Sequence, residues 1–398
     1  MPTGVSEKPT ASNAPAWRAV FGNGIERQSG AAPSFTLRVP SEDALDHILA
    51  TDTYSAAMAF VRGEFDVEGD LVEAVRFKGW QPHSRLRKKL LGTVARCASV
   101  LEETFQTKAQ AARDIRFHYD RSNEFYQLFL DPRMVYSCAY FRNPEATLEQ
   151  AQLAKLDHIC RKLDVSHGER FLDIGCGWGA LVLRAAGRYG AFATGCTLSL
   201  AQHRYATTRV REEHLDGCVH ILEQDYRDLT GSYDKIASVG MFEHVGRRRA
   251  PVYFRKMAQL LSPGGLFLNH AIARAQGVGD DAASLFVRRR IFPGGELIHL
   301  YEVIREAENA GFEVLDVENL RPHYARTCRM WEERLTANRE AALRLVDEAT
   351  YRAWRIWLAA SSLGFEEGFN SIYQVLMAKR GGTRRRATRE YMYPPERS

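Results

Sequence analysis

The sequence predicts an α/β fold, in which a doubly wound parallel sheet follows a small N-terminal unit of strands and helices. Two observations lead to this prediction. From Leu148 onward, short apolar runs alternate with amphipathic helical segments, as in parallel sheets whose crossovers are helices. A glycine-rich stretch, "LDIGCGWG", ends the first of these runs, where open α/β sheets carry ligand-binding loops. A chain of 398 residues has room for one large domain and one smaller one.

Composition divides the chain into five segments. We expect a flexible N-terminal tail, a small α+β domain, a basic helical linker, a large α/β domain and a basic C-terminal tail. These are residues 1–33, 34–82, 83–112, 113–380 and 381–398.

The small domain shows strand and helix signals. "FTLRV" predicts a strand, and Ser41 predicts a helix start, because a serine followed by acidic residues is a frequent cap. Two further helices flank a glycine-containing turn in "AMAFVRGEFDVEGDLVEAVRFKGW".

The large domain alternates predicted helices and strands. An amphipathic helix over residues 148–163 leads to the strand "RFLDIG", the helix "ALVLRAAGRYG" and the strand "AFATGCTL". Further strands are expected in "HILEQD", "YDKIASVGMFEHV", "LLSPGGLFLNHAI" and "GFEVLDVENL". Residues 331–379 are mainly helical in pattern and are expected to end in an edge strand.

The formal net charge of +5 is concentrated in short basic runs. They include Arg85–Lys89, Arg247–Arg249, Arg288–Arg290 and Arg384–Arg386. Such runs are usually solvated surface, but several together favour an anionic partner, and both phospholipid headgroups and nucleic acid qualify.

The cysteines and the apolar runs bear on compartment. Seven cysteines, without close CxxC pairs, match neither a disulfide framework nor a zinc-ligand pattern, so no metal is expected. The first residues carry no apolar signal core, and no run approaches the roughly 18 apolar residues of a membrane span. We therefore expect a cytoplasmic protein whose membrane contact is peripheral.

The stretch Leu172–Gly179 is the strongest local signal. Alternate glycines let the backbone approach a ligand closely, and Asp173 supplies an acceptor at the strand end. A dinucleotide fingerprint needs GxGxxG and an acidic residue at the end of the second strand. Here the spacing is GxGxG, and the second strand ends in "GCTLS". S-adenosylmethionine (SAM) is therefore the favoured cofactor, with a dinucleotide site and a simple tight turn as alternatives.

Three polar side chains lie at the ends of neighbouring strands. Glu243 follows the fourth strand in "GMFEHVG", His270 ends the fifth, and Tyr324 follows the sixth. Because open α/β sheets bind ligands at the carboxyl edge, these groups could converge on one polar pocket. The alternative for Glu243 is a helix cap.

Upstream lies a segment rich in aromatic rings, residues 117–141. Eight of its 25 residues are Phe or Tyr, against 11% aromatic residues overall, and Cys138 stands near its end. Rings in such numbers pack a core or wall an apolar ligand slot.

Together these motifs resemble the cyclopropane-fatty-acyl-phospholipid synthase family of SAM-dependent methyltransferases. The similarity covers residues 55–380 and is carried by "HYDRSNEFYQLFLDPRMVYSCAYF", "LDIGCGWG", "TLSLAQ", "DYRDL", "SVGMFEHVG", "RRIFPGG" and "PHYART". It implies a class I SAM-dependent methyltransferase fold, which is Rossmann-like, behind a small N-terminal domain that docks on lipid or membrane.

The resemblance also implies individual roles. The residues implied to bind SAM are Tyr136, Ser137, Asp173, Gly175, Gly177, Thr197, Gln202, Asp225, Tyr226 and Arg227. The first two contact the cofactor from the aromatic segment, the next three cradle it, the following two reach its ribose and the last three lie beside its adenine. The residues implied to seat a bicarbonate ion near the transferred methyl are Cys138, Glu243, His270, the backbone of Ile272, and Tyr324.

The activity implied by the resemblance is cyclopropanation. SAM would methylate the cis double bond of unsaturated phospholipid acyl chains, and a carbocation deprotonated by bound bicarbonate would close the ring. A dry pocket would hold the alkene against the sulfonium, aromatic faces would stabilise the cation, and Glu243 would orient the bicarbonate. Some members carry a cysteine where this chain has Ser361, which excludes a covalent route through that position.

The implied partners are unsaturated phospholipid acyl chains and the anionic inner face of a membrane. No nucleic-acid partner is expected, because no base-reading module is present; the oligomeric state stays open, a homodimer included. The alternatives are a related methyltransferase that makes methyl- or methylene-branched or hydroxylated chains or methylates an amine, a non-catalytic lipid-binding protein, and a nucleic-acid methyltransferase. Fold and cofactor loop do not separate these.

The basic linker generates a first testable prediction. Replacing Arg85, Arg87, Lys88 and Lys89 with Gln should weaken binding to anionic liposomes, since each cation near such a surface contributes about 1 kcal/mol at low salt. Co-sedimentation measures liposome binding, and calorimetry should show unchanged SAM affinity. Equal co-sedimentation of the variant at low salt would contradict the docking role.

Overall fold

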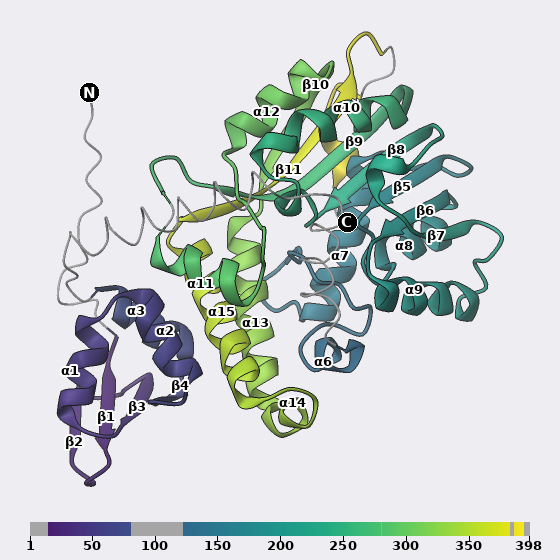
Figure 1. Ribbon diagram of the computed structural model, residues 1–398. Helices are drawn as coiled ribbons and strands as arrows, with labels where there is room; N and C mark the ends of the chain where they lie inside the picture. Colours follow the sequence, from purple (N-terminus) through teal and green to yellow (C-terminus); the bar gives the residue numbers. More distant parts are fainter. Residues whose placement is uncertain (1–14, 81–121, 280, 383–385, 394–398) are drawn as a thin grey trace, which may run out of the picture.

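The computed structural model describes residues 15–80, 122–279, 281–382 and 386–393. A small sheet with three helices forms the N-terminal unit, and a seven-stranded sheet forms the centre of the large domain (Figure 1). The predicted linker, residues 83–112, lies outside the described residues.

The N-terminal unit is a four-stranded sheet of order β2-β1-β3-β4 with helices packed on it. Its elements are β1 Trp17–Phe21, β2 Glu26–Ser29, β3 Phe35–Val39, α1 Glu42–Ala50, α2 Thr53–Val61, β4 Asp66–Gly69 and α3 Leu71–Trp80. The predicted strand and the cap at Ser41 are confirmed, because the Ser41 side chain accepts a hydrogen bond from the N–H of Ala44 at 3.2 Å.

The predicted flexible tail, residues 1–33, is wrong for Trp17–Ser29. These residues form the hairpin of β1 and β2, and β1 lies between β2 and β3. Phe21 is buried, and the ring of Trp17 lies 5.4 Å from that of Phe77, so this stretch belongs to the core of the unit. The hairpin is short and β2 is exposed throughout, which leaves little hydrophobic alternation in the sequence.

The large sheet has the order β10-β11-β9-β8-β5-β6-β7. Its strands are β5 Arg170–Ile174, β6 Phe192–Thr197, β7 Val219–Glu223, β8 Tyr233–Val239, β9 Leu261–Arg274, β10 Phe312–Asn319 and β11 Asn370–Lys379. The helices of this domain are α6 Asn123–Gln127, α7 Leu148–Lys162, α8 Ala180–Tyr189, α9 Leu200–Glu212, α10 Ala250–Leu260, α11 Ala282–Arg290, α12 Leu300–Asn309, α13 Arg321–Ala337, α14 Arg339–Leu345 and α15 Glu348–Glu366. Short 3-10 helices are η2 Tyr226–Asp228, η3 Phe242–His244, η4 Arg247–Arg249 and η5 Glu390–Met392.

Helices cover both faces of this sheet, as the predicted doubly wound fold requires. Apolar residues of α7, α8 and α9 pack on one face, and those of α10 and α12 pack on the other. The parallel strand pairs are β9 with β8, β8 with β5, β5 with β6, and β6 with β7. The first of these strands in the chain, β5, lies in the middle of the row. The predicted α/β architecture is confirmed.

The prediction of an edge strand at the end of the large domain is wrong. β11 lies between β10 and β9 and runs antiparallel to both. Ile372, Val375, Leu376 and Met377 are all buried, on alternating faces, as in a strand covered on both sides. The continuous apolar run is the signature of an interior strand.

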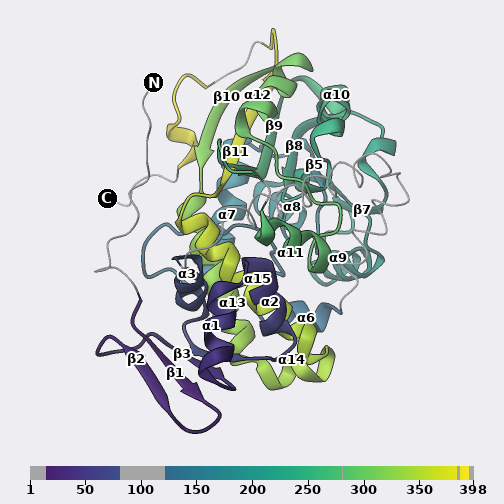
Figure 2. The same cartoon turned by 60° about the vertical axis from the view of Figure 1, so that its left-hand side comes forward.

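Two long helices, α13 and α15, pack together beside the carboxyl edge of the sheet. The N-terminal unit packs on α15 through α2 and α3 (Figure 2). Ion pairs join these parts at Arg76–Glu366 (2.5 Å), Arg352–Asp66 (3.2 Å) and Arg329–Asp70 (2.8 Å). The small unit is therefore attached to the helices that enclose the aromatic core of the large domain.

The described part of the predicted basic tail, residues 386–393, packs back on α7. Arg386 pairs with Asp164 at 3.0 Å, Met392 is buried, and Tyr391 donates to the carbonyl of Lys162 at 3.3 Å. Among the helices of the described residues, none combines the length and the apolar character that crossing a bilayer requires.

The corrected N-terminal boundary can be tested by mutation. Phe21→Ala should destabilise the N-terminal unit by about 3–5 kcal/mol, because it removes a buried ring. Gln28→Ala, on the exposed β2, should stay within about 0.5 kcal/mol of the wild type. Denaturant unfolding measures the stability of both variants. If Phe21→Ala leaves the free energy of unfolding unchanged, residues 17–29 belong to a flexible tail after all.

Candidate active site

One pocket opens at the carboxyl ends of β5, β6 and β8. It encloses about 1170 Å³ of space, open solvent at its mouth included. The glycine-rich turn after β5 and the start of η2 line it, and the segment around Tyr136 closes one side. This is the edge at which open α/β sheets bind ligands.

The residues predicted to bind SAM all line this pocket. They are Tyr136, Ser137, Asp173, Gly175, Gly177, Thr197, Gln202, Asp225, Tyr226 and Arg227. The structure thus brings together residues from four separate segments, and their contact with SAM stays a prediction.

The glycine turn needs its glycines. Gly175, Gly177 and Gly179 have φ angles of +77°, +55° and +89°, in the left-handed region that disfavours side chains. A Cβ at Gly177 would meet no protein atom within 4 Å and would extend into the space of the pocket. A Cβ at Gly175 would lie 2.8 Å from Cγ of Met241.

Asp173 supplies an acceptor inside the pocket. It is 3% exposed, and its Oδ1 has no hydrogen-bond partner among the described residues. Burial raises the pKa of Asp173 to about 7, against the opposing effect of Lys155. An unpartnered carboxylate oxygen suits an amino group such as that of SAM, so the residues fit the cofactor.

Lys155, on α7, is a pocket residue that the motifs did not reveal. It is 2% exposed, its Nζ donates to Oγ of Ser137 at 2.8 Å, and burial lowers its pKa to about 8. Gln152, one turn earlier, donates to the carbonyl of Ser137 at 2.9 Å. Both side chains fix the segment that closes the pocket. The signal that could have revealed them is polar residues on the apolar face of an amphipathic helix.

Local hydrogen bonds and an ion pair hold the residues that are predicted to contact the ribose and the adenine. Thr197 donates to Oε1 of Gln202 at 2.7 Å, and the N–H of Ser199 donates back to Thr197 at 3.2 Å. Arg227 binds the Asp225 carboxylate at 2.5 Å, and burial raises the pKa of Tyr226 to about 12. Trp178, Met241, His244 and Arg249 also line the pocket and were not predicted.

Glu243 and Ile272, predicted to seat bicarbonate, are in direct contact. The N–H of Ile272 donates to Oε1 of Glu243 at 2.7 Å. Oε2 of Glu243 is shielded from solvent and has no hydrogen-bond partner in the described part of the chain. Burial raises the pKa of Glu243 to about 7. Glu243 lies in η3, but its side chain bonds to β9 and not to the start of its own helix, which argues against a helix cap.

Cys138 and Tyr324 approach the neighbouring strand β11 through Leu320. The N–H of Leu320 donates to the carbonyl of Ile372 at 2.9 Å, and Ile372 is paired with Ile272 across β11 and β9. The carbonyl of Leu320 accepts from the N–H of Tyr324 at 3.1 Å. Sγ of Cys138 lies 3.8 Å from that carbonyl, and burial raises the pKa of the thiol well above its usual value. Tyr324 stands in the first turn of α13, directly after β10 as predicted, and its ring stacks on Phe365 at 4.6 Å.

His270 lies on β9 two residues before Ile272, so both side chains point to the same face. It is fully buried, and its Nε2 has no partner among the described residues. Burial lowers the pKa of His270 well below its usual value, and the nearby cations Lys155 and Lys162 act in the same direction. A neutral imidazole N–H and a carboxyl group with a raised pKa are donors that suit a small oxyanion, so the residues fit bicarbonate.

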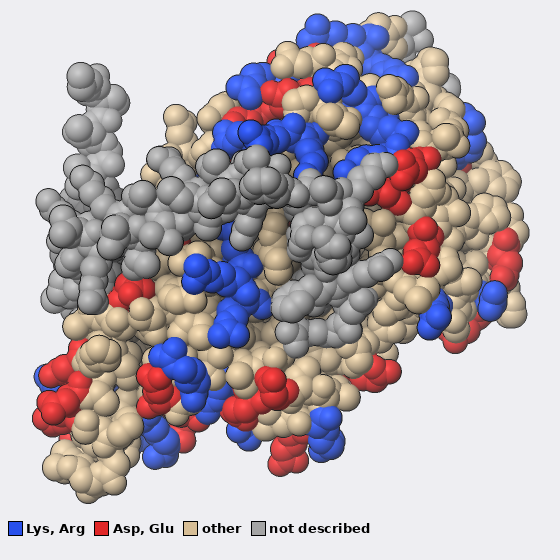
Figure 3. Space-filling view, in the orientation of Figure 1, with Lys and Arg blue, Asp and Glu red and all other residues tan. Residues whose placement is uncertain are grey.

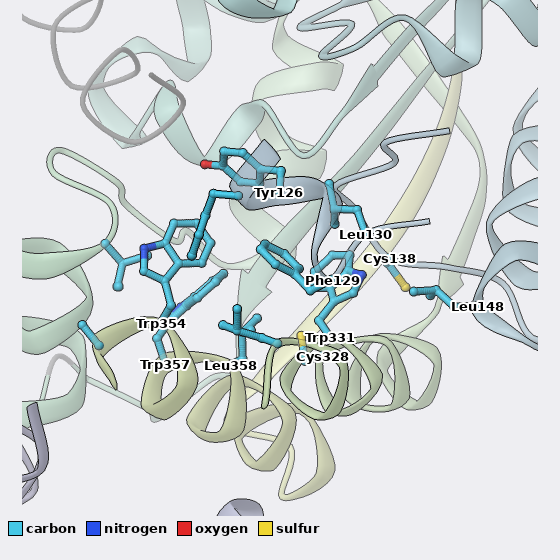
Figure 4. Packing of buried hydrophobic residues seen from close by; sticks show 14 of the residues in the cluster. Tyr126, Phe129, Leu130, Cys138, Leu148, Cys328, Trp331, Trp354, Trp357 and Leu358 are labelled. Atoms are coloured by element: carbon cyan, nitrogen blue, oxygen red, sulfur yellow. The ribbon is translucent and has the colours of Figure 1, made fainter. Parts of the chain in front are cut away.

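A cluster of aromatic rings adjoins these groups. Figure 4 shows Trp331, Trp354 and Trp357 converging with Tyr126 and Phe129 in one buried apolar layer. The rings of Tyr136 and Trp331 lie 5.3 Å apart, and those of Tyr126 and Trp178 lie 4.9 Å apart. The ring-rich segment therefore contributes both to a core and to the wall of the cofactor pocket, since Tyr136 and Trp178 belong to both. Ser361, on α15, is half-buried in this region.

The fold and the pocket define the class of protein: a class I SAM-dependent methyltransferase. The family model "Mycolic acid cyclopropane synthetase" matches residues 106–375, and the chain belongs to this family. A probable fatty acid methyltransferase of Pseudomonas putida is 40% identical over 363 residues, which are 90% of each chain.

Two further relatives show the range of the family. The tuberculostearic acid methyltransferase UfaA1 of Mycobacterium tuberculosis is 38% identical over 286 residues, covering 69% of this chain and 67% of that protein. A crystal structure of mycolic acid cyclopropane synthase CmaA1 complexed with SAH and CTAB has a TM-score of 0.65 and 33% identity, covering 67% of this chain and 98% of that one. The protein is thus a SAM-dependent methyltransferase of a lipid-modifying family.

The glycine turn generates a prediction on cofactor binding. Gly177→Val should abolish SAM binding, because its side chain would extend into the pocket. Gly217→Val is the matched control, since a Cβ there also meets no atom within 4 Å and its φ is not in the left-handed region. Calorimetry measures both affinities. Unchanged SAM affinity in folded Gly177→Val would refute the assignment of the pocket.

Proposed function

We propose that the protein cyclopropanates unsaturated acyl chains of membrane phospholipids, with SAM as methyl donor and a bound bicarbonate ion as cofactor. The observation that carries the proposal is the convergence of Glu243, His270, Cys138 and Tyr324 on the paired strands β9 and β11, at Ile272 and its partner Ile372, beside the cofactor pocket. When bound, SAM supplies an electrophilic methyl group, and bicarbonate supplies a base for the proton that ring closure releases.

The residues of the chain would divide the work as follows. Asp173 and the glycine turn would hold the cofactor, and the buried aromatic cluster would exclude water from the reacting alkene. Glu243, with a pKa of about 7, exchanges a proton readily near neutral pH, so it can donate to the anion and later accept a proton from it. His270, held neutral, contributes a hydrogen-bond donor without adding a second cation beside the sulfonium.

The aromatic cluster supports an apolar substrate that becomes cationic. Trp331 and Trp354 are fully buried, and Tyr136 lies between the cofactor pocket and Trp331. Aromatic faces attract a positive charge by about 0.5–2 kcal/mol per ring when water is excluded. CTAB, present in the CmaA1 structure, is a detergent with one long alkyl chain, which is the shape of an acyl substrate.

A phospholipid substrate would bring the enzyme to a membrane surface. The net charge is +5, and on the face shown in Figure 3 Lys and Arg side chains gather in the region of α10 and α12. Basic surface attracts anionic headgroups. We therefore propose that the protein is cytoplasmic and associates peripherally with the inner face of the membrane.

The second candidate is a different product from the same site. The relative UfaA1 is named a tuberculostearic acid methyltransferase, and the Pseudomonas putida relative a probable fatty acid methyltransferase. A 1,2-hydride shift in the same cation, followed by loss of a proton from the new methyl group, would give a methylene branch. Capture of water, followed by loss of a proton from the added water, would give a hydroxyl group. The position and strength of the base at Glu243 would decide among these outcomes.

Glu243 gives the sharpest test. Glu243→Gln should keep the fold and most SAM affinity but reduce ring closure by about 10²–10⁴, the usual contribution of acid–base catalysis. The variants Cys138→Ala, His270→Ala and Tyr324→Phe should bind the anion more weakly. Added bicarbonate should partly restore the activity of the less impaired variants. Lipid mass spectrometry of a host fed methyl-labelled methionine reports substrate and product together, and activity is normalised to folded protein.

The outcomes are distinct. Full cyclopropanation by folded Glu243→Gln in bicarbonate-depleted buffer would refute the mechanism. A shift to methylene-branched or hydroxylated lipids would support Glu243 as part of the base that closes the ring. Labelled product on a small amine instead of on lipid would refute the proposed substrate.

A further inference from the structure

A row of polar side chains crosses three neighbouring strands from the candidate anion site. His270 on β9 faces Gln374 on β11, and Gln374 faces Glu318 on β10. Residues directly opposite each other in antiparallel strands place their side chains on the same face. His270 and Gln374 are both fully buried, whereas the Glu318 side chain is 21% exposed. The row therefore leads from the buried site toward the outside of the sheet.

Gln374 makes a bond that constrains His270. Its Nε2 lies 3.2 Å from Nδ1 of His270. In this orientation of the amide, the NH₂ group donates and Nδ1 accepts, which leaves the proton of a neutral ring on Nε2. Nε2 is the nitrogen that has no partner among the described residues.

The topology places that N–H on the side of the anion site. The two ring nitrogens lie at different corners of the imidazole, so Nε2 faces away from Gln374 and β11. On the other side of β9 runs β8, and Glu243 follows the end of β8 in η3. The carbonyl of His270 accepts from the N–H of Gly240 at 2.9 Å, at the start of that connection.

We propose that Gln374 is a positioning residue, whose amide fixes the Nε2–H tautomer of His270 so that the ring donates its single N–H to the bound anion. This inference rests on the proposed function, because it assigns the donor to the anion named there. Other side chains at position 374 would not do this. A carboxylate would accept a proton from Nδ1, and an apolar side chain would leave both tautomers accessible.

The test measures the tautomer directly. Protein labelled with ¹⁵N-histidine is compared by long-range ¹H–¹⁵N NMR as wild type, Gln374→Met and Gln374→Glu, with His270→Asn to assign the ring. Wild type should show a protonated Nε2. Gln374→Met, which keeps the volume, should show a mixture, and Gln374→Glu should move the proton to Nδ1. Leu376→Met is the control, because Leu376 is a buried neighbour on the same face of β11 and its substitution should leave the tautomer unchanged.

The same proteins are titrated with ¹³C-bicarbonate and with SAM. Loss of one hydrogen bond should weaken bicarbonate binding by Gln374→Met about tenfold, with SAM affinity unchanged. If Gln374→Met fails to fold, Gln374→Glu, which keeps the shape of the side chain, carries the test.

Three results would overturn the inference. The first is a wild-type ring protonated at Nδ1, and the second is a tautomer that Gln374→Met leaves unchanged. The third is a variant that loses the Nε2–H tautomer but binds bicarbonate with undiminished affinity. A wild-type protein that shows the Nε2–H tautomer but binds no bicarbonate would instead refute the anion in the proposed function, and the role of Gln374 toward it would fall with it.

Discussion

The pairing of Ile272 on β9 with Ile372 on β11 is the interaction on which the candidate active site depends. The N–H of Ile272 donates to Glu243. The carbonyl of Ile372 accepts from Leu320, whose own carbonyl accepts from Tyr324 and lies near Cys138. Both strands are interior, because β9 lies between β8 and β11 and β11 lies between β9 and β10. Groups from distant segments are therefore held by two rigidly paired strands, which is how a site keeps its geometry.

The sequence predicted what depends on local pattern. The glycine turn, the alternation of strands and helices, and the polar residues after each strand are all visible in short stretches, because strand ends of a parallel sheet must meet at one edge. The N-terminal hairpin was not predicted, because β1 is short and β2 has no buried residue. Trp17 of this hairpin packs on Phe77, sixty residues later in the chain.

Gln374 and Lys155 could not be found in the same way. The relation of Gln374 to His270 exists only because β11 enters between β10 and β9, whereas the sequence pattern predicts an edge strand there. Lys155 belongs to a helix face that also buries Gln152, His158 and Lys162. Each of these α7 side chains has a partner on another segment, such as Lys162 with Asp316 at 3.0 Å. Such partners can be identified only from the tertiary structure.

These buried charges also prepare the site for a cation. In the protein without cofactor, burial keeps the pKa values of Asp173 and Glu243 near 7, and His270 stays neutral. A sulfonium bound nearby would favour the ionised form of both carboxyl groups and would oppose protonation of His270. Lys155, with a pKa of about 8, can lose its proton to offset the added charge. The arrival of SAM would thus turn Glu243 from a group that holds a proton about half of the time near neutral pH into one more often ionised. In the proposed reaction, an ionised Glu243 would accept from bicarbonate the proton that ring closure releases, so the cofactor itself would set the protonation state that this step needs.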